Sequence, residues 1–401
     1  MSIVGYRVKI PVLIGVLLTL FGLAGCGATD EAGQGDRFDE ETEEVSQAMP
    51  SGSSSSGGPQ NTNPFGWGSP CDEWSKVPLT PNPSKMAYSF GDGAGQYFAG
   101  MDYPNPGTGE SVGAIARVAV DNSQAVVEEP FAEVTRFHSI AIDPATSEPA
   151  ALGFLQDGTV GLYQAAGGVW YYAAPLGDDA AEICYTQKHL YVLSRGLYAG
   201  VVDLVQMDPE TLQTQMVYHL GQGVAYSSYS TFATQHYLEC FGHKVTVLWV
   251  KDLSVWNYHL SVLDESTMTV KVNDLPQQVC PWQVAPGASQ DKWLVGGGFY
   301  RMVIGPIGGG WANANTSVSH VHQLTRSADG ILYGLGWNGG SESLVASAGL
   351  AAGGSWGQPL PTYSSLLWEG SNGSMYIAAS VHQPGAPQYP MHMYACDRPK
   401  K

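Results

Sequence analysis

Four ring side chains that can bind ligands stand ahead of or within short apolar segments of the sequence. An imidazole ring can exchange a proton near neutral pH or bind a metal, and an indole ring offers a large apolar surface. If the apolar segments are the innermost strands of repeated sheets, we expect the four side chains to gather near one mouth of a central channel. A register error of one residue would turn any of them to the other face of its strand. They are His138, His236, Trp282 and His322.

Two short histidine patterns could serve a metal ion. His320 and His322 in SHVHQ share one face of a strand, which is a spacing that metal ligands use. The MHM of residues 391–393 offers thioether and imidazole, which are copper ligands. No cysteine or carboxylate stands near the first pattern, and the second lies in what should be the last strand of the fold. We therefore expect hydrogen-bonded or surface histidines, with no metal and no cofactor.

The sequence contains no complete catalytic motif. GGSWG (353–357) has the Gly-x-Ser-x-Gly spacing and GLGWNG (334–339) has a Gly-x-Gly-x-x-Gly spacing. A nucleophile elbow and a phosphate-binding loop each open a helix, however, and helical periodicity is missing here. A His-Glu-x-x-His helix is also missing. Asp178, Asp179 and Glu182 form an acidic cluster of the kind that glycosidases need. The surrounding GDDAAE also fits a turn that leads into a strand, and this is the interpretation we prefer. We expect no catalytic residues, and enzyme activity stays open as the least favoured hypothesis.

The N-terminus has the pattern of an export signal. Arg7 and Lys9 precede an apolar run over residues 10–22. A bilayer-spanning helix needs about twenty apolar residues, so a run of this length followed by small residues fits a signal peptide. We assign residues 1–25 to this signal.

Residues 23–26 read Leu-Ala-Gly-Cys, which resembles the lipobox of bacterial lipoproteins. The resemblance implies that Cys26 is lipidated and becomes the first mature residue. Gly27 follows where an aspartate would favour retention in the inner membrane. The resemblance therefore implies anchoring in the outer membrane, with the face of that membrane left open.

Charge and composition divide the rest of the chain. Residues 26–70 hold eight acidic residues, one basic residue and a run of Ser, Gly and Pro, which predicts a disordered tether. Residues 71–401 form the folded domain, with 28 acidic and 15 basic residues within a chain of net charge −18. Nucleic acids and anionic lipids need basic surfaces, so we expect the domain to bind neither.

One pattern repeats through the folded domain. The segments CYTQKHLYVL (184–193) and CFGHKVTVLW (240–249) match at an offset of 56, as do MDPET (207–211) and LDEST (263–267). Each unit has an apolar strand, a Gly, Ser or Asp turn and an alternating strand, and helical periodicity is missing. The pattern predicts units of four short strands. Successive units are anchored at Ile140, Cys184, Cys240, Val284, Leu324 and Leu366.

A Gly-Gly-x-Trp motif falls late in three of these units. Paired glycines suit a tight hairpin turn, because both central residues need positive φ. The turn would lead into the outermost strand of the unit. The tryptophans either pack between neighbouring sheets or form platforms for sugar rings. They are Trp170, Trp311 and Trp356.

The repeats resemble those of propeller-repeat proteins as a class, over roughly residues 80–396. The resemblance implies an all-β β-propeller with seven blades, or six to eight, of four-stranded antiparallel sheets. It also implies that ligands bind at a mouth of the central channel. No named propeller family is matched. The Asp-box of sialidase-like propellers has Ser-x-Asp-x-Gly leading to Trp, and its parts are scattered here between SADGILYGLGW and GGSW.

Five cysteines remain for disulfides in an exported protein. Cys71 and Cys396 open and close the folded region, and a closed ring brings its termini into one sheet, so we expect this pair to bond. Sheets pack about 10 Å apart and a disulfide needs Cα atoms within about 7 Å, which disfavours a bond between Cys184 and Cys240. We expect Cys240 to bond Cys280 instead, leaving Cys184 as a free buried thiol.

Three hypotheses for the function follow. The first is a non-catalytic binding or scaffold module that a lipid anchor holds in the cell envelope, where it recognises protein partners. The second is a lectin that uses the Gly-Gly-x-Trp aromatics, and the third is a glycan-cleaving enzyme. We favour them in that order.

Overall fold

The computed structural model of this protein describes strands and turns from residue 74 to residue 396, all within the unit Pro59–Lys401. Side chains are described for most of residues 133–275 and for shorter stretches elsewhere. The predicted segments 1–25 and 26–70 lie outside the described residues, as do Cys26 and Cys71. The described ranges are 74–77, 79–80, 87–93, 96–104, 111–119, 125–127, 131, 133–177, 179–196, 200–225, 237–251, 257–275, 280–286, 292–298, 303–306, 312–313, 320–326, 332–338, 341–347, 355–359, 366–369, 374–380 and 391–396.

The described strands form seven sheets, which we number in chain order of their innermost strands. Every strand pair is antiparallel except β2 with β6. Sheet 1 is β3 (Ala87–Gly93), β4 (Gln96–Pro104), β5 (Ser111–Ala119), β6 (Ala125–Val127) and β2 (Leu79–Thr80). Sheet 2 is β7 (Val134–Ile142), β8 (Pro149–Leu155), β9 (Val160–Ala166) and β10 (Val169–Pro175). Sheet 3 is β11 (Ala180–Tyr185), β12 (Leu190–Ser194), β13 (Val201–Met207) and β14 (Thr214–Gln222).

The remaining sheets repeat this order. Sheet 4 is β15 (Leu238–Phe241), β16 (Lys244–Val250), β17 (Tyr258–Asp264) and β18 (Thr269–Asp274). Sheet 5 is β19 (Cys280–Pro286), β20 (Lys292–Gly298), β21 (Val303–Pro306) and β22 (Ala312–Asn313). Sheet 6 is β23 (His320–Arg326), β24 (Leu332–Asn338), β25 (Ser341–Ser347) and β26 (Ser355–Pro359). Sheet 7 is β27 (Leu366–Glu369), β28 (Met375–Ser380), β29 (Met391–Cys396) and β1 (Ser75–Val77).

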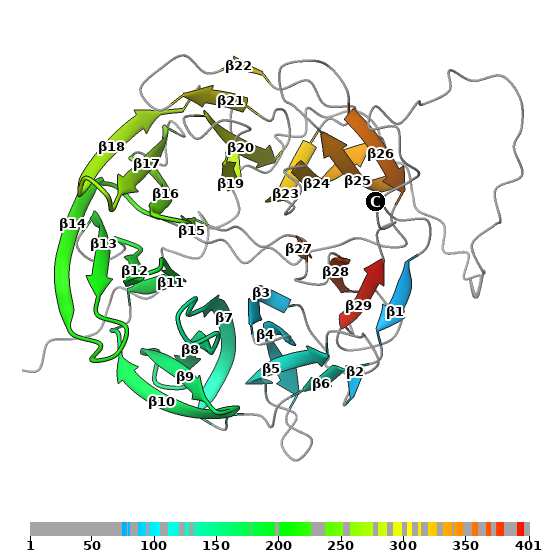
Figure 1. Ribbon diagram of the computed structural model, residues 1–401, viewed down its shortest axis with the longest axis horizontal. Helices are drawn as coiled ribbons and strands as arrows, with labels where there is room; N and C mark the ends of the chain where they lie inside the picture. Colours follow the sequence, from blue (N-terminus) through cyan, green and yellow to red (C-terminus); the bar gives the residue numbers. More distant parts are fainter. Residues whose placement is uncertain are drawn as a thin grey trace, which may run out of the picture. The chain divides into compact units, whose positions relative to one another are not determined.

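The sheets are arranged around a common axis, with one strand of each sheet nearest the axis and one at the rim (Figure 1). The innermost strands of neighbouring sheets contact one another, as β7 contacts β11 and β11 contacts β15. All six repeat anchors that the sequence predicted lie on innermost strands. The prediction of an all-β fold of repeated four-stranded antiparallel sheets is confirmed, with sheet 1 differing by a fifth strand, β2, that pairs with β6 in parallel.

The hydrophobic core lies between the sheets. Inner and middle strands are buried along most of their length because a neighbouring sheet covers each face, as in β12 and β16. Between sheets 2 and 3, Leu152, Leu162 and Leu190 belong to one buried cluster. Outer strands such as β10 have a neighbour on one edge only and are largely exposed.

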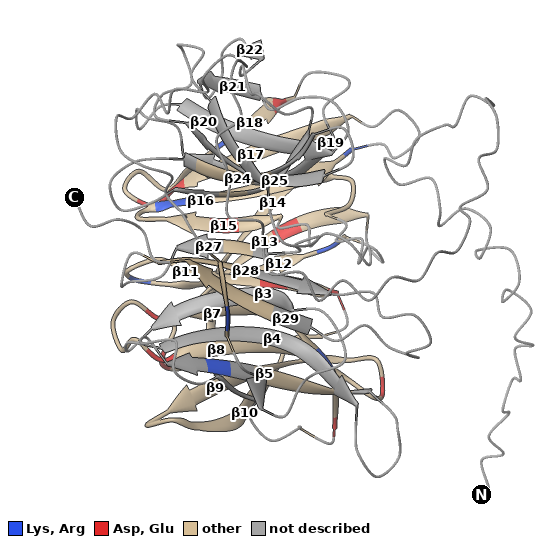
Figure 2. Cartoon of the chain, turned by 90° about the vertical axis from the view of Figure 1, so that its right-hand side faces the viewer, with Lys and Arg blue, Asp and Glu red and all other residues tan. Residues whose placement is uncertain are grey.

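Turn residues join the strands as the repeat pattern predicted. Asp208, directly after β13, and Asp264, the last residue of β17, each accept a hydrogen bond from the backbone N–H two residues later, at 3.1 and 2.9 Å. Acidic residues are found in loops between the strands as well as on the strands (Figure 2). Gly167 and Gly168, between β9 and β10, have φ of 58° and 79°, which only glycine adopts readily at both positions.

The two ends of the described chain meet in sheet 7. Strand β1, the first described strand, pairs with β29, the last, so that Ser75 lies opposite Ala395. Cys396 is disulfide-bonded and buried. Because Cys71 lies outside the described residues, the bond between Cys71 and Cys396 stays a prediction.

Within the described part of the chain, no helix has the length and apolar character needed to cross a membrane.

Candidate functional site

A buried carboxylate joins sheet 3 to sheet 4. Glu182, on the innermost strand β11, is 4% exposed and accepts hydrogen bonds from two backbone N–H groups of the next sheet. The N–H of Tyr237 lies 3.1 and 3.0 Å from its two oxygens, and the N–H of Leu238 lies 2.8 Å from Oε2. Burial raises the pKa of Glu182 to about 8, although both backbone hydrogen bonds act in the opposite direction.

A disulfide joins the same two sheets two residues further along. Cys184 bonds Cys240, and their Cα atoms are 5.7 Å apart. The predicted bond between Cys240 and Cys280 is therefore wrong, and so is the prediction that Cys184 is a free thiol. The prediction used the spacing of sheets packed face to face, whereas these residues lie on β11 and β15, where the sheets converge towards the axis (Figure 1). Convergence brings the Cα atoms within disulfide range.

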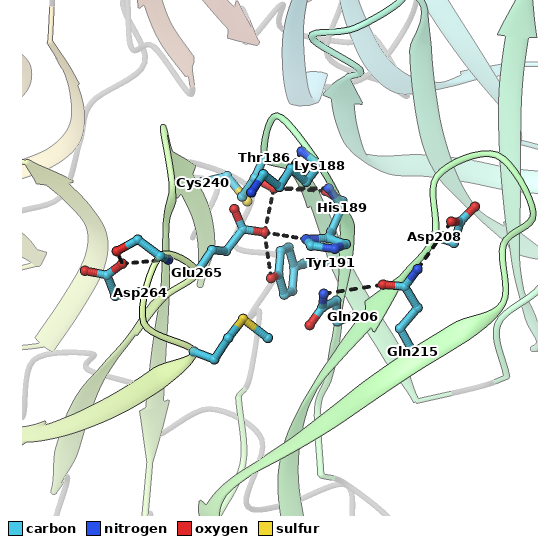
Figure 3. A network of polar contacts seen from close by, with 12 residues as sticks. Thr186, Lys188, His189, Tyr191, Gln206, Asp208, Gln215, Cys240, Asp264 and Glu265 are labelled. Atoms are coloured by element: carbon cyan, nitrogen blue, oxygen red, sulfur yellow. Dashed lines mark hydrogen bonds and ion pairs between the residues drawn. The ribbon is translucent and has the colours of Figure 1, made fainter.

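A polar network joins the turns of sheets 3 and 4 (Figure 3). Glu265, in the turn after β17, accepts three hydrogen bonds on Oε1 from residues of sheet 3. The hydroxyl groups of Thr186 and Tyr191 lie at 2.8 Å and Nδ1 of His189 lies at 2.7 Å. Burial and the bond to Glu265 raise the pKa of Tyr191, so its hydroxyl remains a donor. The Glu265 side chain is 5% exposed.

The direction of these bonds decides what the network can do. In a hydrolase triad a nucleophilic hydroxyl donates to an imidazole nitrogen, which removes its proton. A triad also has the contact between Nδ1 of the histidine and a carboxylate, but here both hydroxyls donate to Glu265 and neither donates to the imidazole. The hydroxyl of Thr186 also accepts bonds from the backbone N–H groups of Lys188 and His189. The network therefore links the turns of the two sheets, and neither of its hydroxyl groups is placed to lose its proton to the imidazole.

We expect Glu265→Gln to lower the free energy of unfolding by about 1–2 kcal/mol, because one charged acceptor of three hydrogen bonds becomes neutral and a new amide N–H₂ must find acceptors. Guanidinium unfolding of the two proteins measures the difference. Glu210→Gln, at an exposed position of sheet 3, is the control and should stay within about 0.5 kcal/mol. Equal unfolding curves for Glu265→Gln and the parent would contradict this role.

Three of the predicted ligand-binding residues lie at equivalent backbone positions in three different sheets. His138, Trp282 and His322 each lie on an innermost strand at a β-bulge, where the register with the second strand shifts by one residue. Bulges re-aim side chains and are common near binding sites. The side chains of these three residues, and His236 altogether, lie outside what the structure describes.

The three tryptophans of the Gly-Gly-x-Trp motif differ in how far the structure describes them. Trp170 is on β10, half-buried, and packs against a core cluster that spans sheets 1 and 2 and includes Ile115 and Phe137. This contact corresponds to the packing interpretation at that position. Trp356 is on the outer strand β26, and its side chain is not described. Trp311 lies outside the described residues, directly before β22.

The sequence analysis missed the role of Glu182, although a signal was present. Ser139 and Glu182 both directly follow a bulge on an innermost strand, and both bond backbone N–H groups of the next sheet. Ser139 Oγ accepts from the N–H of Ile183 at 3.0 Å. Gln283 and Gln323 occupy the same position in sheets 5 and 6. Aligning Ile183, rather than Cys184, with Ile140 would have placed these polar residues in one column.

Large apolar side chains are exposed on the rim of sheets 2, 3 and 4, the sheets to which most of the described side chains belong. Seven described residues of this kind have exposed fractions from 38% to 69%. All lie on the outer strands β10, β14 and β18 or in the turn that precedes β18. We call this set the apolar rim: Val169, Tyr171, Tyr172, Met216, Val217, Met268 and Val272. The sequence analysis missed it, because exposure of these strands depends on which edge of each sheet faces outward.

Among the residues whose positions are described, no group of three or more metal-binding side chains comes together.

Comparison with known proteins identifies the fold. No protein-family model matches the sequence, and no curated protein matches it. Several solved structures do match. The domain is a β-propeller. The β-propeller domain of the trilobed protease from Pyrococcus furiosus has 11% identity and a TM-score of 0.51, over 78% of this chain and 94% of that chain.

Two further matching structures have little sequence in common with this chain. Hydrazine synthase from Kuenenia stuttgartiensis has 12% identity and a TM-score of 0.53, over 75% of this chain and 94% of that one. The WD40 repeats of RRP9 have 9% identity and a TM-score of 0.54, over 82% and 99%. At these identities the likeness shows the propeller fold alone.

Proposed function

We propose that the protein is an outer-membrane lipoprotein whose β-propeller is a non-catalytic binding module for protein partners of the cell envelope. The lipobox-like residues 23–26 support the anchor, and the acidic tether after them would hold the propeller away from the membrane. The apolar rim carries the proposal of a protein partner. Exposed apolar side chains on neighbouring sheets are a common feature of protein interfaces.

The electrostatics of the domain support the same class of partner. Its surplus of acidic residues disfavours nucleic acid and anionic lipid surfaces. The described polar network at the junction of sheets 3 and 4 has its hydrogen bonds directed between the two sheets and presents no nucleophile. A rigid propeller with an apolar rim fits recognition of another protein.

The test uses the full chain with a C-terminal tag, produced in the bacterium that encodes it. We expect radiolabelled palmitate to label the parent protein and not Cys26→Ser. We also expect the parent, purified from membranes in mild detergent, to retain one envelope protein in stoichiometric amount. A lipidated protein that always purifies alone would contradict the proposal.

Binding of the purified protein to glycans distinguishes the lectin hypothesis from the protein-partner proposal. Saturable binding of the purified full chain to a defined glycan, lost in Trp311→Ala or Trp356→Ala, would show that sugar is the ligand and that the protein-partner proposal is wrong. We expect no such saturable binding.

A further inference from the structure

Strand β14 (Thr214–Gln222) lies along the rim of sheet 3 as its outermost strand (Figure 1). Within the described part of the fold, β13 pairs with its inner edge and no strand pairs with its outer edge. An outer edge of this kind presents backbone N–H and C=O groups that another strand can bind.

Length and composition separate β14 from the other described outer strands. It has nine residues, TQMVYHLGQ, with no Lys, Arg, Asp, Glu or Pro. Proteins normally protect sheet edges with short strands, charges, proline or β-bulges. Register shifts with β13 place bulges at Gln215 and Leu220, so the regular part of the β14 edge is Met216–His219.

The other described outer strands are shorter or have a charge or a proline. Strands β1, β2 and β22 have only two or three residues each. Strand β18 has six residues with charges at Lys271 and Asp274, and β10 and β26, of seven and five residues, end at Pro175 and Pro359.

The side chains of β14 suit an added strand. Met216 is 47% exposed and Val217 is 38% exposed, and consecutive strand residues point to opposite faces of the sheet. An added strand would therefore meet an apolar side chain on each face, and cross-strand apolar pairs are the main source of sheet stability. Tyr218, on the same face of β14 as Met216, is held in place, since its hydroxyl donates to Gln206 at 2.9 Å and contacts Met268 of the next sheet.

Charge indicates which strand could bind. Asp208 and Glu210 lie in the turn that leads into β14, and hydrogen bonds from Thr211 lower the pKa of Asp208, so the turn is negative at neutral pH. The whole chain has a net charge of −18, which disfavours a second copy as the occupant. The tether is also acidic, with eight acidic residues and one basic residue. A strand from a different protein, with a basic residue beside this turn, is the complementary occupant.

We propose that the outer edge of β14 binds an extended, apolar segment of an envelope protein by β-strand addition, with a basic residue of that segment beside Asp208 and Glu210. In this mode backbone hydrogen bonds supply affinity, and alternate side chains supply specificity. This inference rests on the proposed function, and it names the surface and the mode of binding.

The experiment places a photo-reactive residue in the full-length protein inside living cells, at Val217 in one strain and at Val169 or Val272 in two others. All three positions are exposed on outer strands, so the second and third are matched controls. We expect a crosslink from position 217 to one other envelope protein. Met216→Lys should reduce the yield of that crosslink about tenfold or more, because a charge now lies on the edge. Ala145→Lys, in an exposed turn before β8 and outside the apolar rim, should leave it within about twofold.

Hydrogen exchange of the purified crosslinked complex then reports the binding mode. We expect slower exchange of β14 amides in the complex than in the free protein, and unchanged exchange in β18. Both lysine variants should retain the parent's melting temperature, because their positions are exposed.

The other outcomes separate the two proposals. Crosslinks from position 169 or 272 alone, or a crosslink from 217 without slower exchange in β14, would overturn strand addition and leave the binding function standing. A crosslink from 217 to a second copy of this chain would replace the partner with self-association. The lack of any crosslink at all three positions would contradict both proposals.

Discussion

Replacing both Cys184 and Cys240 with alanine is expected to lower the free energy of unfolding by roughly 4 kcal/mol. The disulfide closes a loop with a sequence separation of 56, and a crosslink of that span restricts the unfolded chain strongly. It also joins the innermost strands of sheets 3 and 4, so its loss weakens contact between two neighbouring blades. Guanidinium unfolding without reductant, followed by the fluorescence of the tryptophans, measures the loss.

A second variant separates the bond from the packing of the two side chains. Cys184→Val with Cys240→Val retains apolar volume at both positions and lacks the bond. We expect it to remain well below the parent in stability. If this variant unfolds at the parent's denaturant concentration, or if the alanine pair costs less than about 1 kcal/mol, the crosslink is not what stabilises the junction.

The second large effect is a dependence of stability on pH that comes from Glu182. In the folded protein the pKa of Glu182 is raised to about 8, from an ordinary value of 4.5. The folded state therefore holds this proton more tightly than the unfolded chain does. The stability that depends on Glu182 is fully present below about pH 4.5 and is lost as the pH rises to about 8. The total loss is on the order of 3–5 kcal/mol, because each pKa unit corresponds to about 1.4 kcal/mol.

Unfolding of the parent and of Glu182→Gln from pH 5 to pH 9 tests this dependence. The amide cannot ionise, so we expect the variant to lose several kcal/mol less than the parent over that range. Its absolute stability at pH 5 can be lower, since its N–H₂ group needs new acceptors, and the comparison is therefore between slopes. Glu210→Gln is again the exposed control and should follow the parent. Equal slopes for Glu182→Gln and the parent would show that this carboxyl does not set the pH dependence.

The junction of sheets 3 and 4 and the edge of β14 have different roles. At the junction, Glu182, the disulfide and Glu265 link the two blades at successive points from the innermost strands to the outer turns. Such a junction holds sheet 3 in a fixed position. A fixed sheet is a suitable support for an edge strand that binds a partner, because the strand is already ordered and binding then costs less conformational entropy.

The sequence alone determined the repeated local structure of this protein. Alternating and buried-strand patterns, the paired glycines at residues 167–168 and the Asp-led turns after β13 and β17 each depend on near neighbours in the chain. Such local preferences act wherever the unit stands, so the four-stranded units and their innermost strands could be predicted. Closure of the ring through β1 and β29 followed from the same repeat.

Tertiary structure alone decided the cysteine pairing, the burial of Glu182 and the exposure of β14. The Cα atoms of Cys184 and Cys240 lie 5.7 Å apart because the sheets converge on the axis, and no local sequence pattern predicts that distance. Glu182 loses its water because the next sheet covers it, which raises its pKa. Strand β14 is open at its outer edge because it is the last strand of its sheet, whereas its residues alone would suit a paired strand equally well. Distances and solvent contact between sheets depend on how the whole ring closes, and therefore on residues far apart in the sequence.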